Sequence, residues 1–183
     1  MAVITQLPKA IRPVRDDAAS FRAAFRHLAG GVSVITTGRG EDRTGLTATS
    51  ISSLSAEPPT IFFGLNLSSS SYPVLQRHRS FGVNFLSATQ KQVADRFAGR
   101  GGFKGDARFG EGDWTRLVTG APVLEGALAI LDCETEEAIE RHSHTILIGR
   151  VKAIREAETE GALLYWRGIY GKLDETLQYG AGI

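Results

Sequence analysis

Short runs of β-branched and aromatic residues, separated by glycines and prolines, recur along most of this chain. They predict strands at 32–37, 60–65, 80–86, 127–139, 145–154 and 165–170, and an extended run at 46–55. Helices are predicted at 21–29, 72–78 and 89–98, with Ser20 and Thr89 as N-caps of the first and last. Helices and strands do not alternate regularly, which argues against a doubly wound sheet. We expect a mainly β protein with helices, folded as an antiparallel barrel.

Length and charge narrow the class of protein further. The 183 residues suffice for one domain, and we expect a flexible arm at 1–16 followed by a single domain at 17–183. The net charge of +1 argues against a nucleic-acid partner. No apolar run is long enough to span a bilayer or to form a signal peptide, so we expect a cytoplasmic protein without a membrane partner. The single cysteine, Cys133, excludes an intrachain disulfide.

The run from Leu46 to Ser55 has hydroxyl side chains on both faces of a predicted strand. Burying either face is costly, because an unpaired buried hydroxyl costs about 1–3 kcal/mol. One face is therefore expected to meet water or a polar ligand. Small side chains also let a flat ring approach the N–H and C=O groups of the backbone. A solvated edge strand is the other interpretation of this composition.

Four consecutive serines lie in the polar loop at 66–71. Hydroxyls and loop amides suit a phosphate even where no Walker motif is present. An ordinary serine-rich turn has the same composition, so the residues alone leave both interpretations open.

Three other motifs are weaker. The glycine-rich stretch 99–105 lacks the G-x-G-x-x-G spacing and follows no strand, so we interpret it as a surface loop. No G-x-S-x-G elbow supports a serine hydrolase. His142 and His144 would share one face of an extended segment, but a metal site lacks a third ligand there. We expect no metal; His142 reads as a solvated turn residue, and His144 as either structural or functional.

Several segments occur in an order that is typical of one family. They read GGVSVITT at 30–37, GLTATSISSLSAEPP at 45–59, FGVNFL at 81–86, GAPVL at 120–124 and HTILIGRV at 144–151. Together they resemble the flavin reductase domain family, short reductases that supply reduced flavin to two-component monooxygenases. The resemblance covers about Phe21 to Leu173 and implies a Greek-key FMN-binding split β-barrel, usually a homodimer.

The resemblance also implies which residues form the site. It implies flavin contacts at Thr47, Ala48, Thr49, Ser50, Ser53, Asn66, Ser68, Ser69, Ser71, Asn84, Lys91, Phe97 and Tyr170. His144 matches a histidine near the nicotinamide and is the expected catalytic residue. Many members have Gly-Asp where this chain has His142 and Ser143, so the hydrogen-bond partner of His144 is open.

The activity implied is hydride transfer from C4 of a nicotinamide to N5 of a flavin. FMN is the expected flavin, with FAD possible, and NADH or NADPH is the co-substrate. The reduced flavin would pass to a partner monooxygenase. Two alternatives remain: a reductase with bound FMN that reduces a corrinoid or ferric iron, and a non-catalytic flavin-binding protein.

Overall fold

The computed structural model describes residues 17–158 and 161–174. The predicted arm at 1–16 and the last nine residues of the predicted domain lie outside these ranges. No helix within them is long and apolar enough to cross a membrane.

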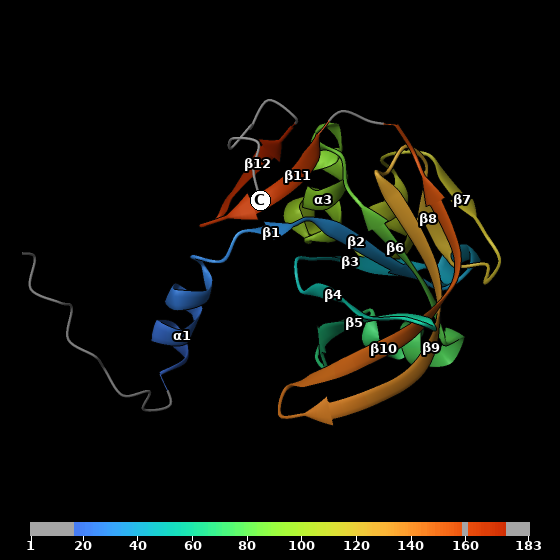
Figure 1. Cartoon of the computed structure of the whole chain (residues 1–183), viewed down its shortest axis with the longest axis horizontal. Coiled ribbons are helices and arrows are strands. Elements are labelled where there is room, and N and C mark those ends of the chain that lie inside the picture. The colour runs from blue at the N-terminus through green and yellow to red at the C-terminus, as the bar shows by residue number, and fades with distance from the viewer. Residues whose placement is uncertain (1–16, 159–160, 175–183) are drawn as a thin grey trace, which may run out of the picture.

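A seven-stranded antiparallel sheet dominates the fold (Figure 1). Its order is β3-β2-β6-β9-β10-β5-β4. The strands are β2 (Ser33–Thr37), β3 (Thr44–Ala48), β4 (Ile51–Ala56), β5 (Pro59–Asn66), β6 (Ser80–Phe85), β9 (Ala129–Arg141) and β10 (His144–Glu156). The two edge strands, β3 and β4, are consecutive in the chain, so the sheet must curl to bring its edges near each other. These edges are not paired with each other, and the split barrel stays a prediction.

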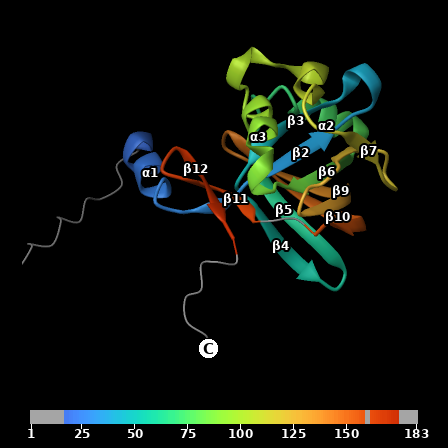
Figure 2. The ribbon, with the colours of Figure 1, turned by 90° about the horizontal axis from the view of Figure 1, so that it is seen from above.

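The remaining elements flank this sheet. A small sheet contains β1 (Gly30–Gly31), β11 (Ala162–Trp166) and β12 (Ile169–Leu173), and a second contains β7 (Trp114–Arg116) and β8 (Pro122–Leu124). The helices are α1 (Ala18–Phe25), α2 (Tyr72–His78) and α3 (Lys91–Phe97). Short 3-10 turns lie at Gly40–Asp42, Ala88–Gln90, Arg100–Gly102 and Gly105–Phe109. Figure 2 shows α1 standing apart from the large sheet, on the side of β11 and β12.

The core consists of two apolar clusters, and β2 contributes to both. All of its residues are buried, and consecutive side chains point to opposite faces of a strand. Val34 accordingly packs with Phe97, Val123 and other residues beneath α3. Ile35 packs in the second cluster, with Phe63 and Phe81. β2 is therefore buried on both faces, between the two clusters.

The first helix begins earlier than predicted. The expected helix at 21–29 with Ser20 as its N-cap was wrong at both ends, because α1 spans Ala18–Phe25. Asp17 is the cap: its carboxylate accepts hydrogen bonds from the backbone N–H groups of Ala19 (3.0 Å) and Ser20 (3.1 Å). A carboxylate at this position also favours the positive end of the helix dipole.

The third helix starts differently from its prediction too. Its first residues, Ala88–Gln90, form a 3-10 turn before α3 begins. Ser87, not Thr89, is the cap, and it forms a capping box with Gln90, whose side chain accepts from the Ser87 N–H at 3.0 Å.

Two strand predictions also change. The extended run at 46–55 is two strands, β3 and β4, separated by an exposed bend at 49–50. The strand predicted at 165–170 is the β11–β12 hairpin, with a turn at 167–168 where both residues have positive φ. A turn of this kind reverses the chain within two residues.

Candidate functional site

The bend between β3 and β4 is the centre of the candidate site. Thr49 and Ser50 are both exposed there, and two pockets open beside them. Thr47 points elsewhere: its hydroxyl donates to the carbonyl of Ala94 in α3 at 2.6 Å. Ala48 is buried at 8% exposure. Of the hydroxyl side chains at 46–55, Thr47 therefore holds β3 against α3, whereas Thr49 and Ser50 face solvent.

The first pocket, which we call the tyrosine pocket, has a volume of about 200 Å³. The rings of Tyr165 and Tyr170 meet there edge to face, with centroids 5.3 Å apart. Lys91 and Arg100 lie over the Tyr170 ring and both pair with Asp95, at 2.6 and 2.8 Å. Burial, with the nearby Asp95 carboxylate, raises the pKa of Tyr170. The pocket is lined by Val32, Thr47, Ala48, Thr49, Ala98, Arg100, Tyr165 and Tyr170.

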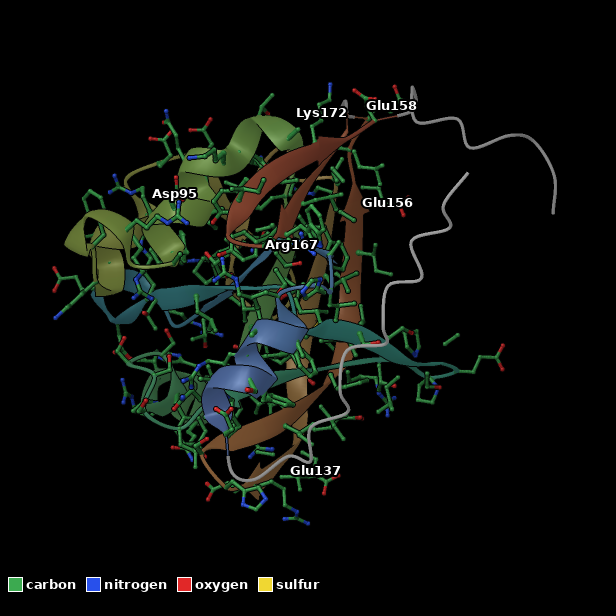
Figure 3. The ribbon with its side chains drawn as sticks, turned by 90° about the vertical axis from the view of Figure 1, so that its left-hand side faces the viewer. Asp95, Glu137, Glu156, Glu158, Arg167 and Lys172 are labelled. Atoms are coloured by element: carbon green, nitrogen blue, oxygen red, sulfur yellow. The ribbon has the colours of Figure 1, made fainter. Side chains whose placement is uncertain are left out.

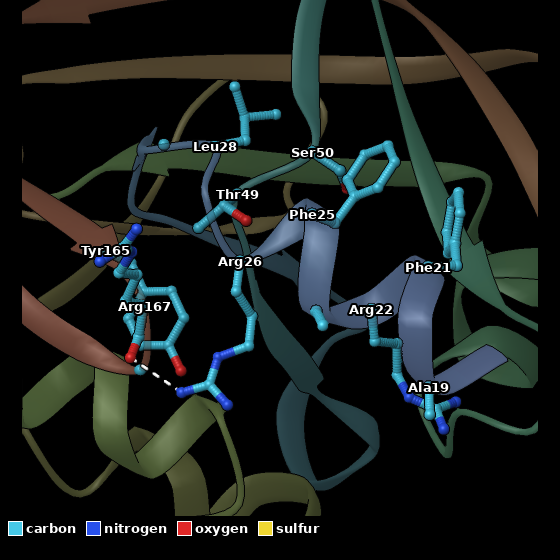
Figure 4. Close-up of a pocket in the computed structure, with 13 residues that line it drawn as sticks. Ala19, Phe21, Arg22, Phe25, Arg26, Leu28, Thr49, Ser50, Tyr165 and Arg167 are labelled. Carbon is cyan, nitrogen blue, oxygen red and sulfur yellow. Dashed lines mark hydrogen bonds between the residues drawn. The ribbon is translucent and has the colours of Figure 1, made fainter. Parts of the chain in front are cut away.

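The second pocket, which we call the arginine pocket, lies between α1 and the bend (Figure 4). Its volume is about 850 Å³. Arg22 of α1, Arg26 directly after α1 and Arg167 of the β11–β12 turn contribute to its wall, together with Thr49 and Ser50. Figure 3 shows Arg167 at the end of the hairpin next to α1. No sequence signal assigned these arginines to a site.

The serine loop, residues 66–71, is organised by its own hydrogen bonds. The Asn66 side chain accepts from the Ser68 N–H (2.8 Å) and hydroxyl (2.7 Å). The Ser69 hydroxyl accepts from the Ser71 N–H at 3.3 Å. Ser71 is fully buried, and its hydroxyl donates to the Gly45 carbonyl at 3.0 Å. Ser71 thus anchors the loop to β3, whereas Asn66 and Ser68 are exposed.

His144 lies beside this loop. It pairs with Asn66 across the β5–β10 ladder, and the Leu67 N–H donates to the Ser143 carbonyl at 3.0 Å. The Ser143 hydroxyl lies 2.9 Å from Nδ1 of His144. This contact gives the histidine the partner that the sequence left open.

His142 occupies the first position of the β9–β10 turn, with φ of +53°. Positive φ favours glycine, which agrees with the glycine that the family pattern has here. The side chain is exposed, as expected for a turn residue.

Asn84 and Phe97 lie behind the site rather than on its surface. Asn84 is fully buried: its side-chain N–H donates to the Val34 carbonyl (2.9 Å), and its oxygen accepts from the Leu124 N–H (2.7 Å). Phe97 is 2% exposed and packs against Phe109 with ring centroids 5.0 Å apart. The expectation of direct flavin contact for Asn84 and Phe97 therefore has no exposed surface to support it.

The structure thus brings the predicted residues together in two groups. Thr47, Ala48, Thr49 and Tyr170 line the tyrosine pocket, with Lys91 over its ring. The serine loop and His144 form the other group, at the end of the β5–β10 ladder. The bend lies between them, because Ile51 pairs with Phe63 and the chain before Ile51 continues alongside the end of β5. Ser53 is exposed on the edge strand β4 and lines neither the tyrosine pocket nor the arginine pocket.

Sequence reasoning missed Tyr165 and Arg100. The glycine-rich stretch 99–105 is interpreted from the sequence as a surface loop, yet Arg100 reaches the tyrosine pocket from it. In one continuous strand at 165–170, side chains would alternate between the two faces, so Tyr165 and Tyr170 would point to opposite sides. The hairpin turn instead pairs Tyr165 with Tyr170, which brings the two rings together. Within the ranges that the structure describes, no group of three or more histidine, cysteine or acidic side chains has the arrangement of a metal site.

Comparisons with known proteins agree with the sequence resemblance. The model of the flavin reductase like domain matches residues 25–174. The chain is 41% identical over 153 residues to FMN reductase (NADH) RutF 2 of Methylorubrum extorquens strain PA1, covering 84% of this chain and 88% of that protein.

Two solved structures share the fold. BorF, the flavin reductase component of a bacterial two-component tryptophan halogenase, has a TM-score of 0.80 at 33% identity, covering 87% of this chain and 99% of BorF. The NADH:FAD oxidoreductase SgcE6 of Streptomyces globisporus has a TM-score of 0.81 at 28% identity, covering 96% of this chain and 98% of SgcE6. The family match spans most of the chain, and the protein belongs to the flavin reductase like domain family.

Proposed function

We propose that this protein is an NADH-dependent flavin reductase that uses FMN, and accepts FAD, to supply reduced flavin to a partner monooxygenase. The observation that carries the proposal is the exposed Thr49–Ser50 bend between two pockets, in a chain of this family. When bound, the flavin supplies the redox chemistry by accepting hydride at N5 from C4 of the nicotinamide. The relatives support this assignment by name, as FMN reductase (NADH).

The residues around the bend fit a flat, electron-accepting ring. Their side chains are small, so a ring can approach the backbone closely. Backbone N–H groups along Thr47–Ser50 would stabilise the negative charge that develops on the reduced ring. Tyr170 and Lys91 would border the ring at the tyrosine pocket. Asn84 and Phe97 would support this surface from behind, because neither is exposed.

The serine loop fits the phosphate of FMN. Asn66 offers its side-chain amide N–H and Ser69 its hydroxyl proton beside the end of β5. The Ser68 hydroxyl and N–H both donate to Asn66 and would turn from it to the phosphate. Ser71 would act only by holding the loop to Gly45.

His144 would orient the nicotinamide. The Ser143 hydroxyl is next to Nδ1, which leaves Nε2 to face a second substrate.

We also propose that two copies assemble as a homodimer. Several large apolar side chains are exposed, among them Phe21, Phe25, Leu54 and Ile146. Groups of exposed apolar side chains are typical of association surfaces. Analytical ultracentrifugation at micromolar concentration tests this, and a monomer would contradict it.

The activity is tested by following NADH oxidation at 340 nm with and without added FMN. A flavin reductase that releases its product needs added flavin; a bound-flavin reductase of another acceptor needs only that acceptor; a binding protein oxidises nothing. Thr49→Val and Ser50→Val should weaken FMN binding in a fluorescence titration while folding is retained. Absence of FMN-dependent oxidation would refute the proposed function.

A further inference from the structure

The long β9–β10 hairpin carries His144 at its far end. Each of its two strands has 13 residues, and the hairpin forms the lower edge of the molecule in Figure 1. On the outer side of β9, pairing with β6 reaches only as far as Glu134. In the described part of the chain, residues 135–141 of β9 therefore have no strand on that side. A hairpin end that is supported on one side only needs a further contact to stay in place.

Helix α2 supplies such a contact. Tyr72, its first residue, is 8% exposed and packs in the second apolar cluster, so the core fixes its ring. Its hydroxyl donates to the Glu140 carboxylate at 2.7 Å, and Gln76 donates to the Tyr72 hydroxyl oxygen at 2.9 Å. We call these three residues the Tyr72 clamp. Among the residues that the structure describes, no other side-chain hydrogen bond joins α2 to residues 135–141.

Hydrogen bonding in the Tyr72 clamp runs in one direction. A tyrosine hydroxyl has a single proton, and because Gln76 donates to the Tyr72 oxygen, that proton is left for Glu140. Hydrogen bonds to an ionised carboxylate are stronger than those between neutral groups. The bond to Glu140, followed by burial, raises the pKa of Tyr72, so the hydroxyl keeps its proton near neutral pH. The contact thus has a fixed donor and a fixed acceptor.

The Tyr72 clamp joins two parts of the candidate site. On one side, the Tyr72 N–H donates to the Ser69 carbonyl at 3.0 Å, which bonds the start of α2 to the serine loop. On the other side, Glu140 pairs with Thr145, the residue next to His144. Tyr72 therefore links the serine loop to the strand end that carries the histidine.

We propose that Tyr72, acting through Glu140, is a positioning residue for flavin reduction: it holds His144 at a fixed place relative to the serine loop. This inference rests on the proposed function, in which the loop holds the FMN phosphate and His144 orients the nicotinamide. Hydride transfer requires the two rings to meet at a set distance and angle, and a misplacement of 1 Å can slow such a step by about 10²-fold. Tyr72 and Glu140 act through His144 without touching either substrate.

The test removes the hydrogen bond from each side. Tyr72→Phe deletes the hydroxyl and keeps the ring in the core, whereas Glu140→Ala deletes the acceptor. In stopped-flow mixing with NADH, each variant should lower the limiting rate of flavin reduction by roughly tenfold, as expected for a displacement of less than 1 Å. The Kd for FMN should stay within about twofold, because the serine loop keeps its own bonds to Asn66 and Gly45.

Two further variants of β9 serve as controls. Glu140→Gln keeps a side-chain oxygen that can accept from Tyr72, so it should restore most of the parent rate. Glu137→Ala is the matched control, and it should reduce flavin at the parent rate. Glu137 is an exposed glutamate of the same strand, and over residues 17–158 and 161–174 its side chain forms no ion pair or hydrogen bond.

A double variant separates positioning from general damage to the fold. In a His144→Ala background, Tyr72→Phe should cause no further slowing, because the side chain that it positions is absent. Damage that acts elsewhere in the site would slow both backgrounds by the same factor. The inference is overturned by that result, by a parent rate in Tyr72→Phe, or by a parent rate in His144→Ala.

Amide hydrogen exchange measures the Tyr72 clamp without turnover. Exchange at residues 141–146 should be faster in Tyr72→Phe than in the parent and unchanged in Glu137→Ala. Equal exchange in all three proteins would also overturn the inference. A parent that does not oxidise NADH in the presence of FMN would instead refute the proposed function, and the exchange result would still show whether Tyr72 holds the end of the hairpin.

Discussion

The substitution Asn84→Ala tests whether Asn84 stabilises the fold or contacts the flavin. In the structure the Asn84 side chain joins three strands: it lies in β6, donates to Val34 in β2 and accepts from Leu124 in β8. Alanine leaves the Leu124 N–H without a partner, and Leu124 is only 1% exposed. A buried unsatisfied donor costs about 1–3 kcal/mol, and the lost bond to the Val34 carbonyl adds about 1 kcal/mol. The free energy of unfolding should therefore fall by about 2–4 kcal/mol.

For a chain of this size, each kcal/mol lowers Tm by roughly 2–4 °C, so Tm should fall by about 4–16 °C. Urea unfolding and calorimetry measure this change, and an FMN titration of the folded variant measures affinity. We expect the Kd for FMN to stay within about twofold, because Asn84 exposes no surface to a ligand. Asn66→Ala is the control: Asn66 is exposed in the serine loop, so affinity should fall with little loss of stability. Unchanged stability with weakened FMN binding in Asn84→Ala would refute the reasoning.

Three further predictions concern the other site residues. His144→Ala should slow flavin reduction in stopped-flow mixing with NADH and leave FMN affinity intact. The control variant His142→Ala should reduce flavin at the parent rate. A normal rate for His144→Ala would mean that this histidine is structural. His142→Gly should raise the free energy of unfolding in urea by about 1 kcal/mol, because it removes a left-handed non-glycine residue at φ of +53°; a loss of stability would contradict this. Ser68→Ala with Ser69→Ala should weaken FMN binding more than riboflavin binding, since only FMN has the phosphate; Ser71 is left intact because it anchors the loop, and equal losses for both ligands would remove the phosphate role.

The sequence predicts best those helices and strands whose ends are determined by residues close by in the chain. The helix predicted at 72–78 is α2 (Tyr72–His78), where Pro73 falls in the first turn and Arg79 adopts the left-handed conformation after the last. The strand predicted at 60–65 is β5, longer by one residue at each end. Caps, prolines and runs of β-branched residues act within a few residues, so a single sequence contains the information.

The bend at 49–50 has no such local signal. Neither glycine nor proline interrupts the run from Leu46 to Ser55. The chain bends because β3 pairs with β2 and β4 pairs with β5, at opposite edges of one sheet. That pairing is decided by segments far apart in the chain. The division of the predicted site residues into two groups also depends on this strand pairing, so the order of residues in the chain does not predict it.

The first helix shows how much a periodic pattern leaves undetermined. The spacing of Phe21, Phe25 and Leu28 indicates one apolar face, and the same pattern serves a buried helix and an exposed one. In the structure no residue of α1 is buried, so its position depends on contacts near its C-terminal end. Arg26 donates to the Arg167 carbonyl, and the Trp166 indole donates to the His27 carbonyl at 3.1 Å. The Arg167 N–H also donates to the Arg26 carbonyl (3.3 Å), and the Arg167 guanidinium lies 2.7 Å from Nδ1 of His27. Together these contacts join the end of α1 to the hairpin and shape the arginine pocket. Arg26, which the helical pattern assigns to the polar face, therefore takes part in holding α1 beside the hairpin, a role that the spacing of the apolar residues does not indicate.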